Sequence, residues 1–136
     1  MTGRALRALA GAAVCVTVLG LPAAVAGARR ERPPARLMVS ADEHFLMLSR
    51  QSIVSGPALI QFLNRGEDPH DLRLRRISGP GVSARRTLSV AETPSGGLAE
   101  LKVRLATGRY KLWCSLPGHE QLGMRAKLRV KRRPSH

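Results

Sequence analysis

The most constraining feature of this 136-residue chain is a series of short stretches in which apolar and charged residues alternate. In one of them, Leu101, Val103 and Leu105 are separated by charged residues, and similar alternation occurs in 71–75 and 125–131. In 57–64, which has no charged residue, Ala58, Ile60 and Phe62 share one face. A period of two with charge on one face is typical of strands that are buried on one side. Turn sequences rich in Gly and Pro separate these stretches. The pattern therefore predicts an all-β domain, a Greek-key β-sandwich, over residues 37–132.

The first 26 residues have the pattern of a secretory signal peptide. Arg4 and Arg7 precede an uncharged run, and Ala-Val-Ala at 24–26 provides small residues before a cleavage point. An uncleaved membrane anchor is the alternative, because the uncharged run is long enough to cross a bilayer. The Arg- and Pro-rich segment 27–36 is predicted to be a flexible linker. We therefore expect an extracytoplasmic protein that is secreted, periplasmic or associated with the cell surface.

Charge and composition limit the classes of partner. The net charge is +14, but 43% of the residues are hydrophobic, which excludes a disordered basic tail. The chain has one Trp, one Tyr and two Phe, too few for a base-stacking platform, and its arginines are spread over several predicted strands. We expect partners with acidic surfaces, with an anionic cell-surface polymer or lipid as a further partner, and no nucleic acid. The protein is expected to be a monomer.

One segment combines three side chains that bind soft metals. Cys114, His119 and Met124 follow one another at intervals of five residues, in a turn-prone loop between two predicted strands. If the signal peptide is removed, Cys114 is the only cysteine left, and a lone thiol in an oxidising compartment needs an explanation. A thiolate, imidazoles and a weak thioether form the ligand set of blue copper. That set needs a second histidine, and His70 is the candidate because it begins its own predicted strand after the loop 64–69.

These motifs resemble those of the cupredoxins, the blue copper proteins, over most of the chain from about residue 37. The resemblance implies one type 1 copper site in which His70, Cys114 and His119 are the strong ligands and Met124 is the long axial ligand. It also implies that the edge of His119 reaches the surface among apolar residues. Because four protein ligands leave no open position for a substrate, we expect transfer of single electrons and no enzyme activity. A copper-delivery protein with the same ligands is the alternative, and a basic module for polyanions is a third hypothesis.

The sequence departs from the family beside the first histidine. Many cupredoxins have Asn there, which ties the two ligand loops together, whereas this chain has Asp71. Either the carboxylate forms the tie or the loops are held differently, and Asn64 is a candidate for part of the bonding. A negative charge near the site should favour oxidised copper.

Single residues of these motifs also have structural interpretations that do not involve a metal. Cys114 taken alone is compatible with an inert buried thiol, and Met124 with a core filler. His44 and the terminal His136 are expected to be structural or solvated, and Trp113 and Tyr110 to have packing roles.

Overall fold

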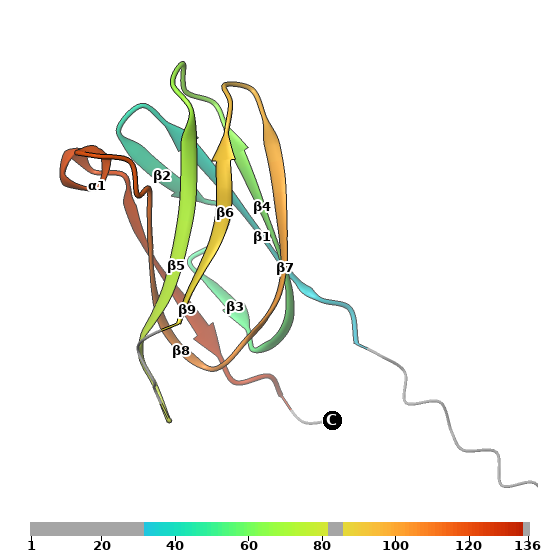
Figure 1. Ribbon diagram of the computed structural model, residues 1–136. Helices are drawn as coiled ribbons and strands as arrows, with labels where there is room; N and C mark the ends of the chain where they lie inside the picture. Colours follow the sequence, from blue (N-terminus) through green and yellow to red (C-terminus); the bar gives the residue numbers. More distant parts are fainter. Residues whose placement is uncertain (1–31, 82–85, 135–136) are drawn as a thin grey trace, which may run out of the picture. The chain divides into compact units, whose positions relative to one another are not determined.

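The computed structural model describes residues 32–81 and 86–134, and these form two facing β-sheets (Figure 1). The four-stranded sheet has the order β2-β1-β4-β7. Its strands are β1 (Ala35–Asp42), β2 (Phe45–Leu48), β4 (Gly56–Asn64) and β7 (Leu98–Leu105). The five-stranded sheet has the order β3-β9-β8-β5-β6. Its strands are β3 (Ser52–Val54), β5 (His70–Ser78), β6 (Thr87–Thr93), β8 (Gly108–Trp113) and β9 (Arg125–Lys131).

The alternating stretches form strands, as predicted. In β4, Ala58, Ile60 and Phe62 are buried, and the residues between them are partly exposed. In β9, Leu128 and Val130 are buried between exposed cations. The buried side chains of both sheets pack into one core, which confirms the predicted β-sandwich.

The domain begins slightly earlier than residue 37. β1 starts at Ala35, and its first two residues, Ala35 and Arg36, pair in parallel with Ala58 and Leu59 of β4. These backbone hydrogen bonds extend the strand into the last two residues of the predicted linker. The predicted signal peptide (1–26) and linker residues 27–31 lie outside the described residues. Within the described part of the chain, no helix is long and apolar enough to cross a membrane.

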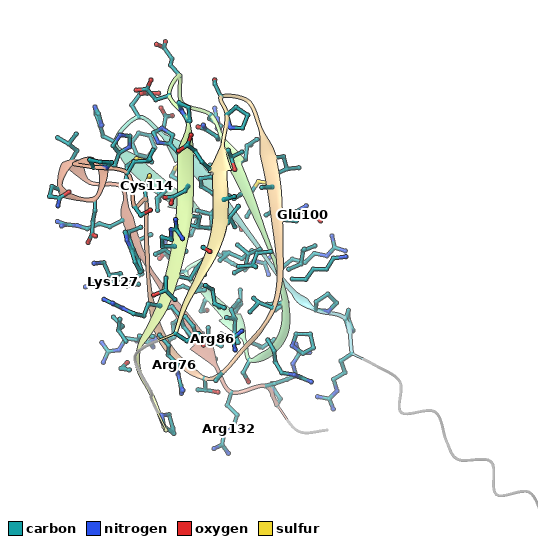
Figure 2. The ribbon with its side chains drawn as sticks, in the orientation of Figure 1. Arg76, Arg86, Glu100, Cys114, Lys127 and Arg132 are labelled. Carbon is teal, nitrogen blue, oxygen red and sulfur yellow. The ribbon has the colours of Figure 1, made fainter. Side chains whose placement is uncertain are left out.

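One end of the sandwich gathers the predicted ligand segments. β5 begins there with His70, and β8 ends there after pairing with β5 and β9. The loop from β8 to β9 contains the short helix α1 (His119–Leu122). Figure 2 shows Cys114 at the same end as α1, whereas Arg76 and Arg132 lie towards the other end.

Candidate metal centre

The loop between β8 and β9 is closed by its own backbone. Cys114 N donates a hydrogen bond to the Met124 carbonyl at 3.1 Å, and Met124 N donates to the His119 carbonyl at 3.0 Å. Gly118, with φ 81°, starts the helical turn and Gly123, with φ 124°, ends it. Both conformations strain any residue with a Cβ. A Cβ on Gly123 would also lie 2.7 Å from the carbonyl oxygen of His44. The loop thereby brings its three candidate ligands back to one point.

The first candidate histidine is placed by the loop between β4 and β5. Asn64 is fully buried, and its Nδ2 donates hydrogen bonds to the carbonyls of Asp68 (2.8 Å) and Thr93 (2.9 Å). Its Oδ1 accepts a hydrogen bond from Gly66 N at 2.9 Å. Asn64 therefore fixes the loop before His70, but it does not join the two ligand loops.

Gly66 allows the loop to pass close to the His70 ring. A Cβ at this position would lie 2.8 Å from His70 Nε2 and 2.5 Å from Glu43 Oε1. The Nε2 edge of His70 is thus packed against backbone, which leaves Nδ1 as the nitrogen available for a ligand.

Four side chains meet in the structure. One ligand atom from each of His70, Cys114 and His119 lies within 4.8 Å of the others. His119 Nδ1 is 3.9 Å from Cys114 Sγ and 3.2 Å from Met124 Sδ. The rings of His70 and His119 meet edge to face, with centroids 5.1 Å apart. All four residues predicted from the sequence therefore converge.

The donor atoms fit a soft metal ion. His70, Cys114 and Met124 are fully buried, and His119 is partly exposed. Both ring nitrogens of His70 are buried and have no hydrogen-bond partner among the described residues. A buried polar atom without a partner is costly, and a metal bond would remove that cost at one of the two nitrogens. Two imidazoles, a thiol and a thioether match the donor set of copper.

Burial favours the uncharged forms of two of these groups. Burial lowers the pKa of His70, and the neighbouring His119 lowers it further, although Glu43, Asp68 and Asp42 partly oppose this. Burial also raises the pKa of the Cys114 thiol. Without a cation the site therefore favours a neutral imidazole at His70 and a protonated thiol. A bound metal ion supplies the positive charge that favours the thiolate.

Asp71 joins the two ligand loops. Ser115 donates hydrogen bonds to its carboxylate from the backbone N (2.6 Å to Oδ1) and from Oγ (2.5 Å to Oδ2). Arg73 Nε forms an ion pair with Oδ2 at 2.9 Å. Burial by itself would raise the pKa of Asp71, but the hydrogen bonds from Ser115, Cys114 and Arg73 outweigh it and lower the pKa. The Asp71 carboxylate thus links the two ligand loops, a link that Asn provides in many cupredoxins. Arg73 neutralises the charge of the carboxylate.

The remaining predicted residues lie outside the cluster. His44 is exposed in the turn between β1 and β2, and His136 lies beyond the described residues. Tyr110 is buried, and its hydroxyl bonds to the backbone of Ala106. Trp113 has the cations of Arg75 and Lys111 near its ring.

Two residues that position the ligand loops, Gly66 and Ser115, were not predicted from the sequence. The glycine was visible in a turn, but its contact with His70 depends on the fold of the loop. Ser115 directly follows Cys114, and its pairing with Asp71 spans 44 residues of sequence. No local pattern marks either contact.

Solved structures with similar folds include two auracyanins and rusticyanin. Auracyanin from the photosynthetic bacterium Roseiflexus castenholzii is 14% identical, with a TM-score of 0.57, over 70% of this chain and 95% of that chain. Auracyanin B is 20% identical, with a TM-score of 0.58, over 74% of this chain and 92% of that chain. Rusticyanin from Thiobacillus ferrooxidans is 17% identical, with a TM-score of 0.57, over 71% and 76%. Rusticyanin is a copper protein. No protein-family model and no curated protein matches the sequence.

At these identities the likeness concerns the fold, and the fold agrees with the expectation from the ligand motifs. Several of the strands, including β4, β5, β7 and β9, and the grouping of His70, Cys114 and His119 agree with the prediction from the sequence. The chain therefore has the cupredoxin fold, which it shares with auracyanin and rusticyanin.

Proposed function

We propose that this chain is an exported blue copper protein that transfers single electrons through one type 1 copper site. His70, Cys114 and His119 would hold the copper, with Met124 as a weaker ligand. The observation that carries the proposal is the convergence of one thiol and two imidazoles within 4.8 Å, beside a buried thioether. Export rests on the signal-peptide pattern of residues 1–26.

The protein supplies a rigid, dry site. A bound copper ion would supply one-electron chemistry, because Cu(I) and Cu(II) are both accessible, although they prefer different geometries. Backbone hydrogen bonds fix Cys114 and Met124, and the Asp71–Ser115 contact fixes the two loops relative to each other. A site that is already formed limits the rearrangement that each electron transfer requires.

His119 is the route to the partner. It is the one ligand with partial exposure, and its short helix carries Leu122, whose side chain is 62% exposed. Pro117 in the same loop is exposed as well. We propose that a redox partner docks on this apolar rim. The net charge, +14 for the whole chain and near +12 without Arg4 and Arg7 of the predicted signal peptide, would steer partners with acidic surfaces towards a monomeric protein.

Burial favours a carrier over a copper-delivery protein. A donor must release its ion to an acceptor through exposed ligands, whereas three of the four ligands here are fully buried. The site is therefore expected to hold copper through repeated redox cycles.

Redox cycling in the presence of a copper chelator tests this role. Copper-loaded protein is reduced and reoxidised repeatedly with excess bicinchoninate, a Cu(I) chelator, while the visible absorption is recorded. A carrier keeps nearly all of its copper over the cycles. Stoichiometric transfer of copper to the chelator in the first reduction would contradict the carrier role and favour delivery.

A further inference from the structure

We infer that the outer face of the five-stranded sheet binds an extended anionic polymer. This surface, the cationic face, consists of outward-facing residues of three adjacent strands: Arg73 and Arg75 on β5, Arg109 and Lys111 on β8, and Arg125, Lys127, Arg129 and Lys131 on β9. Figure 2 shows Lys127 on the opposite side of the two sheets from Glu100 of β7. The inference does not depend on the copper site.

The strand register places cations directly opposite one another. Arg109 pairs with Arg129, and Lys111 pairs with Lys127 on one side and with Arg75 on the other. Like charges at directly opposed positions destabilise a sheet. The opposed cations of this face therefore repel one another, and a bound polyanion would reduce this repulsion.

Few carboxylates neutralise this charge. Among residues 32–81 and 86–134 two ion pairs form, Asp71 with Arg73 and Glu120 with Lys111. The other six cations of the face have no ion-pair partner in this part of the chain. A hollow of about 410 Å³ also opens on the face, and its lining includes Lys111, Arg125 and Lys127.

The spacing of the cations suits a linear polymer. Neighbouring strands are about 4.8 Å apart, and alternate residues along a strand are about 6.8 Å apart. A flexible chain with one anionic group every few ångströms can therefore contact several cations at once. Arginine, with its planar fork, also pairs well with phosphate and carboxylate groups.

A membrane fits the face less well than a polymer. Surfaces that bind membranes combine cations with apolar side chains that enter the lipid. The large exposed apolar side chains of the described residues lie mainly elsewhere: Met38, Phe45, Met47 and Leu98 on the four-stranded sheet and Leu122 on α1. On the cationic face, Ile77 of β5 borders the hollow, and the ring of Trp113 on β8 is only partly exposed, with the cations of Arg75 and Lys111 over it.

Calorimetric titration of the full chain with long-chain inorganic polyphosphate tests the proposal. The double variant Lys127→Gln/Arg129→Gln is expected to bind about ten-fold more weakly or worse, because it removes two cations at the centre of the face. The matched control, Lys102→Gln/Arg104→Gln, removes the same charge from β7 of the other sheet, where both residues are exposed. The control is expected to change affinity by less than about two-fold.

Two results would overturn the proposal. Equal weakening by both double variants would show that net charge alone, and no particular face, attracts the polymer. Binding to phosphatidylglycerol vesicles without binding to polyphosphate would assign the face to membranes. Cys114→Ser, which removes the copper thiolate, is expected to bind polyphosphate like the unchanged chain, so a failure of the copper proposal is distinguishable from a failure here.

Discussion

The four candidate ligands differ in what surrounds them. His70 is packed against Gly66, and neither of its ring nitrogens has a hydrogen-bond partner among the described residues. Cys114 and Met124 are buried and joined by a backbone hydrogen bond, whereas His119 reaches the surface. Substitutions at or beside these residues are therefore expected to affect the metal site in different ways.

Met124→Leu removes the thioether and nearly conserves the side-chain volume. We expect the blue colour to persist because the thiolate and both imidazoles remain, while the reduction potential shifts. The stability of the fold should fall by less than about 1.5 kcal/mol. Visible spectroscopy and redox titration measure both effects. Loss of the colour in a folded variant would show that Met124 is more than a weak ligand.

Gly66→Ala adds one methyl group beside His70. The new Cβ would lie 2.8 Å from His70 Nε2, so the ring must move, and we expect a loss of about 1–3 kcal/mol in stability together with weaker copper binding. Chemical denaturation and copper titration measure the two effects. Glu67→Ala changes an exposed residue of the same loop and serves as the control. Unchanged copper affinity in Gly66→Ala would contradict the role of this contact.

At the level of strands and loops, the site depends on contacts between segments that are distant in sequence. Asp71 at the start of β5 accepts two hydrogen bonds from Ser115 after β8. Arg73 completes the network from β5. These bonds set the separation of the loops that carry the histidines.

The variants Asp71→Ala and Asp71→Asn distinguish two effects of Asp71: its hydrogen bonds with Ser115 and its negative charge. The alanine variant leaves the Ser115 N–H without its acceptor, and we expect a loss of about 1.5–3 kcal/mol in stability. The asparagine variant keeps an acceptor but removes the negative charge, so its reduction potential should rise. Thermal unfolding and redox titration measure these changes. Equal potentials for Asp71→Asn and the unchanged protein would contradict an electrostatic effect of the carboxylate.

The predictable parts of the fold are those with a local pattern. Alternation identified β4, β7 and β9, because in each strand the residues of one face are more buried than those of the other. β6 escaped detection because it is an edge strand with only two buried residues. The ligands were found because Cys, His and Met at regular spacing have few structural uses, whereas Gly66 and Ser115 are common residues whose roles appear only in the folded loops.

At the level of the whole molecule, the proposed redox site and the proposed polyanion-binding face lie on separate surfaces. The ligand end presents His119 and apolar residues, and the cationic face concentrates charge on the five-stranded sheet. Stability links these parts, because the ligands Cys114 and Met124 belong to the hydrophobic core of the sandwich, and His70 is fully buried as well.

The copper-free protein should lose stability as the pH falls below about 6.5. The pKa of His70 is lowered by burial in the folded state, so below its ordinary value the unfolded chain binds a proton that the folded chain does not. The pKa of Asp71 is also lowered, but it acts only at more acidic pH, below 3.8. Urea unfolding between about pH 5 and 7 measures the His70 effect. His70→Gln should flatten this dependence, and an unchanged slope in that variant would contradict the assignment.

The copper spectrum of the purified chain tests the central claim most directly. Adding one equivalent of Cu(II) should produce an intense visible thiolate-to-copper band and an EPR signal with small hyperfine splitting, and Cys114→Ser should abolish both. If Cys114→Ser binds copper with the same affinity and the same spectrum as the unchanged chain, then Cys114 is not a ligand and the proposed site is wrong.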